Sequence, residues 1–74
     1  MTIEEASNIL ADMYLKGRIA REQALSVHLF GIKYADAISG MPLAELVIRA
    51  GIPETYKTEL RKGMNLAKYV TVRA

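Results

Sequence analysis

The sequence predicts an all-α fold, a compact bundle of four to five short helices with one candidate β-strand near the C-terminus. Three observations support this prediction. Apolar residues recur at spacings of three and four along most of the chain, glycine and proline divide these stretches at short intervals, and only residues 68–73 alternate as a strand does. The length of 74 residues and the hydrophobic share of 51% indicate a single domain over residues 1–74. In a domain of this size, burial of the core only just outweighs the conformational entropy that the chain loses on folding.

The N-terminal segment is typical of a capped helix. Thr2, with Glu5 three residues later, forms a capping-box pattern, and apolar residues follow at helical spacing. We therefore predict a helix over residues 3–16 that ends at Gly17. A second helical pattern runs through residues 21–30 and is almost wholly apolar near its end, so we expect it in the centre of the core.

The middle of the chain contains two glycines that we expect to separate helices. We predict a break near Gly31, with residues 33–38 forming a separate short helix; the alternative is one continuous helix through this glycine. A further helix is predicted over residues 42–50. It opens with Pro42, which suits a first helical turn, and runs into Gly51, which suits a left-handed helix exit.

A second helix is predicted directly after this exit. Ile52 can pack into the corner between the two helices, and Pro53 followed by an acidic residue suits a helix start, because a carboxylate is stabilised at the positive end of the helix dipole. We expect this helix at about residues 54–62, ended by Gly63. The side chains expected to project outward are Thr55, Tyr56, Lys57, Thr58, Arg61 and Lys62.

The run Ala50-Gly51-Ile52 together with Leu60 and Gly63 resembles the helix-turn-helix of small phage-repressor-like DNA-binding proteins. In that family Ala-Gly-aliphatic marks the turn, an aliphatic residue falls nine residues after the glycine, and a glycine ends the recognition helix. The resemblance covers about the last half of the chain. It implies sequence-specific binding of double-stranded DNA by a small transcriptional regulator, with the helix at about residues 54–62 in the major groove.

One position departs from the family pattern. Six residues after the turn glycine the pattern has a buried aliphatic residue, whereas this chain has Lys57. Either the long stem of Lys57 lies along the apolar surface, or the neighbouring Tyr56 fills the gap through a slightly rotated helix.

The basic residues are concentrated in the half that carries the motif. Residues 1–40 have a net charge of −1 and residues 41–74 a net charge of +3. This imbalance agrees with an electrostatic footprint for phosphate groups. The candidate DNA-contacting residues are Thr55, Tyr56, Lys57, Thr58, Arg61, Lys62 and Lys68.

The C-terminal residues 68–73 are rich in β-branched residues and alternate, which favours a short strand. No other segment looks like a strand that could pair with it. We therefore expect the same strand of a second subunit to pair with it across a two-fold axis, and this homodimer would also match the two half-sites that helical DNA readers commonly bind. The alternative is an extension of the last helix or a tail on the surface.

Other classes of function have little support in the sequence. There is no cysteine, no metal-ligand spacing and no glycine-rich phosphate loop, so no metal or cofactor is expected. His28 lies between two aliphatic residues, so we interpret it as a core-edge residue with a local hydrogen bond, and we assign no catalytic residue and no enzymatic activity. No apolar run approaches the length of about 20 residues that spans a bilayer. We expect a cytoplasmic location and no contact with a membrane.

A second hypothesis is a protein-interaction module, such as an antitoxin-like or anti-repressor partner, that uses the same helical hairpin to grip another protein. The hydrophobic share of 51% and the departure at Lys57 favour it. The threonine, tyrosine, lysine and arginine side chains of the second hairpin helix favour DNA.

Overall fold

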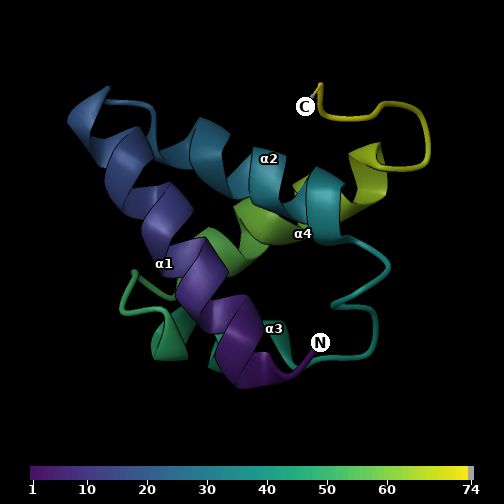
Figure 1. Cartoon of the computed structure of the whole chain (residues 1–74), viewed down its shortest axis with the longest axis horizontal. Helices are drawn as coiled ribbons and strands as arrows, with labels where there is room; N and C mark the ends of the chain where they lie inside the picture. Colours follow the sequence, from purple (N-terminus) through teal and green to yellow (C-terminus); the bar gives the residue numbers. More distant parts are fainter. Residues whose placement is uncertain (74) are drawn as a thin grey trace.

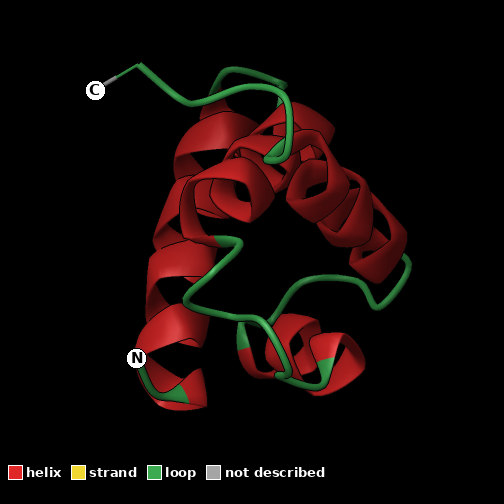
Figure 2. Cartoon of the chain, turned by 90° about the vertical axis from the view of Figure 1, so that its right-hand side faces the viewer, coloured by secondary structure: helices red, strands yellow, loops and turns green. Residues whose placement is uncertain are grey.

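A computed structural model describes residues 1–73, and within them the chain forms four helices. These are α1 (Ile3–Ile19), α2 (Gln23–Tyr34), α3 (Leu43–Arg49) and α4 (Tyr56–Leu66). Helix α2 crosses α4 and also packs against α1 (Figure 1). Helix α3 packs against α1 and α4 at the ends of these helices that lie away from α2. Figure 2 shows that only loops and turns link the helices over the described residues. The predicted all-α class is therefore confirmed.

One apolar core joins all four helices. Phe30 of α2 is the largest side chain that is fully buried, as expected for a helix in the centre of the bundle. Ile52 lies in the corner after α3 and is 6% exposed, which confirms its predicted position. Within residues 1–73, no helix combines the length and the apolar character needed to cross a bilayer. The core residues are Ala6, Leu10, Val27, Phe30, Ile38, Leu43, Leu46, Val47, Ile52 and Leu60.

The start of α1 is as predicted, and its end is not. The Thr2 side chain accepts a hydrogen bond from the Glu5 amide (3.1 Å), and the Glu5 carboxylate accepts one from the Thr2 amide (2.9 Å), so the capping box is present. The predicted end at Gly17 is wrong, because α1 continues to Ile19. A Cβ at Gly17 would lie 2.6 Å from the Cβ of Ser26, so this glycine admits α2 and does not end α1.

Two further glycines lie inside helices, where helix ends were predicted. Helix α2 runs through Gly31 to Tyr34, so the predicted break is wrong, and residues 35–40 form turns in place of a separate short helix. Helix α4 likewise runs through Gly63 to Leu66. Each glycine is buried. Both occur inside a helix because α2 and α4 contact each other at these two positions.

The backbones of α2 and α4 touch where the two glycines face each other. A Cβ on Gly31 would lie 2.7 Å from the carbonyl oxygen of Leu60 and 2.9 Å from the amide nitrogen of Met64. A Cβ on Gly63 would lie 3.1 Å from the Cα of Gly31 and even closer to the carbonyl oxygen of His28. These neighbours are backbone atoms, which cannot turn away as a flexible side chain can. The crossing therefore requires glycine on both helices.

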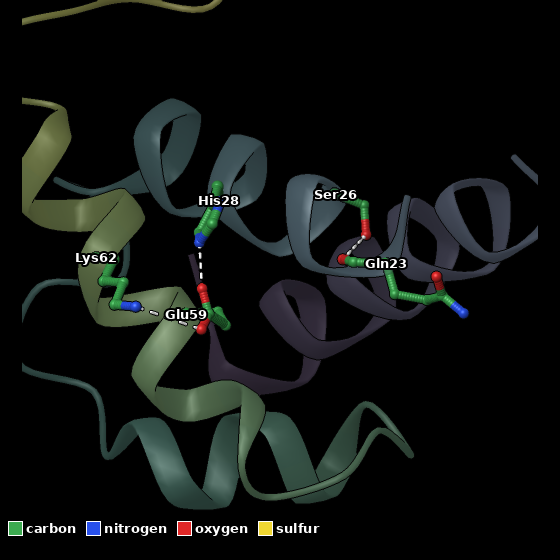
Figure 3. A network of polar contacts seen from close by, with 5 residues as sticks. All are labelled: Gln23, Ser26, His28, Glu59 and Lys62. Atoms are coloured by element: carbon green, nitrogen blue, oxygen red, sulfur yellow. Dashed lines mark hydrogen bonds and ion pairs between the residues drawn. The ribbon is translucent and has the colours of Figure 1, made fainter. Parts of the chain in front are cut away.

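A polar contact also joins α2 to α4. His28, at the edge of the core, donates a hydrogen bond from Nε2 to Oε2 of Glu59, and Nζ of Lys62 lies 3.5 Å from the other carboxylate oxygen (Figure 3). The imidazole partner is thus on another helix, whereas the sequence suggested a local bond. The hydrogen bond from His28 holds the pKa of Glu59 below its ordinary value, and the nearby charge of Lys62 acts in the same direction. Glu59 is therefore ionised at neutral pH.

The C-terminal residues form no strand, so the predicted strand at residues 68–73 is wrong. The chain leaves α4 through a turn in which the amides of Tyr69 and Val70 both donate to the carbonyl oxygen of Leu66, at 2.9 and 3.0 Å. These two amides are therefore occupied within the chain. The tail then lies at the surface next to the end of α2, which matches the alternative interpretation, and the intersubunit ribbon loses its structural basis.

The crossing predicts an unusual response to Gly63→Ala. Alanine favours an exposed helix over glycine by about 1 kcal/mol. Because the new Cβ would overlap the α2 backbone, we expect a net loss of about 1–3 kcal/mol in the free energy of unfolding. Urea unfolding measures it, with Thr58→Ala on the exposed side of α4 as the control. A Gly63→Ala protein more stable than the wild type would contradict the close crossing.

The lowered pKa of Glu59 predicts a loss of stability in acid. The carboxylate contributes to stability in full above the ordinary glutamate pKa, and this contribution is lost as the pH falls through the lower value in the folded state. We expect Glu59→Gln to be less stable than the wild type at pH 7 and to lose less stability between about pH 5 and pH 3. Glu54→Gln, at an exposed carboxylate, serves as the control in the same urea titrations. Parallel pH curves for wild type and Glu59→Gln would refute the assignment.

Candidate nucleic-acid interface

The turn after α3 has the geometry of a helix-turn-helix corner. Gly51 has φ 76°, a left-handed conformation that glycine adopts without strain, as the sequence predicted. The amide of Gly51 donates to the carbonyl of Ile48 (3.0 Å), and the amide of Ile52 donates to the carbonyl of Val47 (3.2 Å). This pair of bonds is the Schellman motif, and the accompanying contact of Ile52 with the core fixes the direction in which the chain leaves α3.

The first residues after the corner form a tight turn that leads into α4. The amides of Tyr56, Lys57 and Thr58 each donate to the carbonyl three residues earlier, at 3.0, 3.0 and 3.3 Å. Such bonds are typical of a 3₁₀ turn at a helix start. Helix α4 therefore begins at Tyr56, two residues later than predicted. Thr55 is exposed at the cap position, and its hydroxyl does not cap the helix.

Tyr56 points into the protein and does not belong to the outward surface on which it was predicted. Its ring packs edge-on against Tyr14 of α1, with 5.4 Å between the centroids and 77° between the planes. Burial, and to a smaller extent the contact with Tyr56, raises the pKa of the Tyr14 hydroxyl. Lys57 is exposed, so Tyr56 fills the aliphatic position of the helix-turn-helix pattern. Of the two explanations for the departure at Lys57, the inward position of Tyr56 agrees with the one in which Tyr56 fills the gap.

The exposed side of α4 is polar, and we call it the α4 face. Thr58, Arg61 and Asn65 lie along its middle, because residues three, four and seven apart share one side of a helix. The sequence prediction omits Asn65 because it ends the helix at Gly63, although the spacing of Asn65 from Thr58 and Arg61 is the signal that places it on this face. The α4 face consists of Lys57, Thr58, Arg61, Lys62, Asn65 and, in the turn after the helix, Lys68.

The positive charges of the α4 face differ in their partners. Lys57 lies 3.6 Å from Glu54 and Lys62 lies 3.5 Å from Glu59, and all but Glu59 of these four side chains are about half exposed or more. The exposed pair of Lys57 with Glu54 contributes less than about 1 kcal/mol, so a phosphate can replace the carboxylate of Glu54 as the partner of Lys57. Among residues 1–73, Arg61 and Lys68 form no ion pair.

The structure thus gathers six of the seven predicted contact residues at one surface and turns the seventh inward. Thr55 stands at the start of α4, and the remaining five belong to the α4 face. Short polar side chains lie near the start of the helix, and long cations lie along both edges. Within the described residues, no group of three or more His, Cys, Asp or Glu side chains could hold a metal ion. The chemistry offered at this surface is hydrogen bonding and positive charge.

The chain was compared with protein families, curated proteins and solved structures. The curated proteins and the solved structures give no match. A family model described as an HTH-like domain matches residues 2–73. The match extends beyond the C-terminal half on which the resemblance was recognised, so α1 and α2 are part of the same unit as the corner and α4. Because the match covers nearly the whole length, the chain belongs to the HTH-like domain family.

Proposed function

We propose that this protein binds double-stranded DNA by inserting α4 into the major groove. The observation that carries the proposal is the α4 face itself, a polar and positively charged helix surface directly after a helix-turn-helix corner. The second helix of such a motif commonly lies in the major groove, and the groove, about 12 Å wide, admits an α-helix. Membership in the HTH-like domain family supports the same function.

The side chains of α4 divide into two groups by reach and chemistry. Thr55 and Thr58 are short polar residues near the helix start, where base edges are usually contacted. Arg61 and Asn65 carry the groups that form two hydrogen bonds with guanine and with adenine, respectively. The lysines at the edges of the α4 face are suited to phosphates, which position the protein without reading the sequence. Tyr56 is a positioning residue that acts through its contact with Tyr14.

We propose, on this basis, sequence-specific binding and a role as a small transcriptional regulator similar to phage repressors. Base-edge donors and acceptors are needed for specificity, and phosphate contacts alone do not supply it. The α4 face offers both kinds of group. The specificity would lie in Thr58, Arg61 and Asn65, since these three occupy the middle of the face.

The two groups predict separable effects on binding. Lys68→Ala should weaken binding to all duplexes alike and reduce the slope of log affinity against log salt by about 0.9, because one phosphate contact is lost. Asn65→Ala should weaken binding to the preferred sequence by about 1–3 kcal/mol and leave the salt slope unchanged. Fluorescence anisotropy with duplexes selected from a random pool, at several salt concentrations, measures both effects.

Lys16→Ala is the control for a lost charge, because Lys16 lies on α1 and is 75% exposed. It should leave both the affinity and the salt slope at their wild-type values. Absence of duplex binding by the wild type at low salt would refute the proposal. An unchanged salt slope for folded Lys68→Ala would show that Lys68 is only solvated surface.

A further inference from the structure

The carboxylate of Glu59 is shared between a residue at the edge of the core and a residue of the α4 face. Its Oε2 accepts a hydrogen bond from Nε2 of His28 on α2, and its Oε1 lies 3.5 Å from Nζ of Lys62 (Figure 3). The side chains of His28 and Glu59 are 27% and 26% exposed, whereas that of Lys62 is 62% exposed. These contacts therefore connect the helix crossing to a cation in solvent.

The other lysine pair of the α4 face has no such inner partner. Nζ of Lys57 lies 3.6 Å from Oε1 of Glu54, at the same spacing of three residues, but the Glu54 side chain is about half exposed. The only histidine of the chain bonds to Glu59 and not to Glu54. Water screens the charge of Glu54 more than that of Glu59. Lys62 is therefore held more firmly than Lys57, as long as Glu59 has no other positive partner.

His28 is the residue of this cluster whose charge changes near neutral pH. Imidazole gains or loses its proton between about pH 5 and pH 8, a range in which ordinary carboxylates stay negative and lysines stay positive. The lowered pKa of Glu59 keeps its carboxylate ionised throughout this range. The chain has one histidine and no cysteine, so no other side chain is expected to titrate there.

Helix α4 supplies the charged groups that face His28. Helix α2 packs against α1 and α4, and within residues 1–73 the side chain of His28 bonds to Glu59 alone. Protonation of His28 therefore acts first on Glu59 and, through it, on Lys62. The ionisable side chains of α1 and of α2 itself, none of which forms an ion pair or hydrogen bond with His28 in this part of the chain, are Glu4, Glu5, Asp12, Tyr14, Lys16, Arg18, Lys33 and Tyr34.

We propose that His28 and Glu59 determine how firmly Lys62 binds a DNA phosphate, so that protonation of His28 strengthens binding to duplex DNA. While His28 is neutral, Lys62 is the positive partner of Glu59, and a phosphate has to compete with that carboxylate. Once His28 is protonated, its charge neutralises Glu59, and Lys62 is released toward the phosphate. His28 and Glu59 are thus positioning residues that act through Lys62. The inference rests on the proposed binding of DNA by the α4 face.

The direction of the pH effect follows from reciprocity. If protonation of His28 favours the phosphate contact, the phosphate contact favours protonation of His28 by the same factor. The complex then binds more protons than the free protein, so the affinity rises as the pH falls. A coupling equivalent to about half a pH unit corresponds to an affinity about threefold higher in the acidic limit.

Fluorescence anisotropy with a random-sequence duplex at pH 7.5 and pH 5.5, at one salt concentration, tests the proposal. The wild type should bind about threefold more tightly at pH 5.5. His28→Gln keeps a hydrogen-bond donor but cannot gain a charge, so its affinity should be the same at both pH values. Lys62→Ala should also lose most of the response, although His28 still titrates in this variant.

Lys57→Ala is the matched control, because Lys57 has a carboxylate partner at the same spacing and no histidine behind it. It should bind more weakly than the wild type and keep the threefold response. Helical circular dichroism at both pH values checks that each variant is folded. A wild-type affinity that is independent of pH, or a response of folded Lys62→Ala equal to that of the wild type, would overturn the proposal.

An NMR titration of the His28 ring in the free protein tests the coupling without DNA. Lys62→Ala should move the midpoint of this titration upward by about 0.3–0.5 pH unit, because a competing positive charge is removed from Glu59, and Lys57→Ala should leave it in place. Duplex binding without this shift would refute the coupling and leave the proposed function intact. The shift without any duplex binding would refute the proposed function and, with it, the phosphate contact.

Discussion

The contact between the backbones of α2 and α4 at Gly31 and Gly63 is the constraint on which the rest of the structure depends. Because neither residue has a Cβ, the helices approach until backbone atoms touch, and this contact requires Gly63 to face α2. With Gly63 facing α2, Leu60 lies in the core and Tyr56 packs against it. This arrangement leaves Thr58, Arg61 and Asn65 on the opposite side, in solvent. The packing of the buried side of α4 thus determines which side chains are exposed on the α4 face.

The surrounding interactions hold α4 in the same orientation. His28 binds Glu59 from α2, and Glu59 also lies near Lys62, so one carboxylate connects the helix crossing to the edge of the α4 face. At the start of α4, Tyr56 contacts Tyr14 on α1. The helix is therefore held by packing at its start, middle and crossing. A preorganised helix loses little conformational entropy when it binds a ligand.

Local signals were predictable from the sequence, and long-range contacts were not. Thr2 and Gly51 were interpreted correctly, because a capping box and a left-handed exit need only residues close in the chain. The sequence predicts helix ends at Gly17, Gly31 and Gly63, which lie inside helices, because a glycine that admits a neighbouring helix looks the same in sequence as one that ends a helix. The two kinds of glycine differ only in which part of the chain packs against them in the folded protein.

The candidate site shows the same division. Its motif and most of its polar residues can be predicted from the sequence. Asn65 is left out because the helix is predicted to end at Gly63, and the inward position of Tyr56 depends on where α4 starts. The alternation of residues 68–73 was real, but the amides of Tyr69 and Val70 bond back to α4. Strand-like periodicity without a partner strand does not make a sheet.

We propose that the crossing of α2 and α4 presents the α4 face for binding to duplex DNA. Titration of ¹⁵N-labelled protein with a random-sequence duplex at low salt, followed by NMR, tests this claim residue by residue. We expect the largest amide changes from Thr55 to Lys68, and no change at Leu25, Leu29 and Ile32 on the outward side of α2. Changes centred on these three residues of α2, or a spectrum unaffected by DNA, would contradict the proposal.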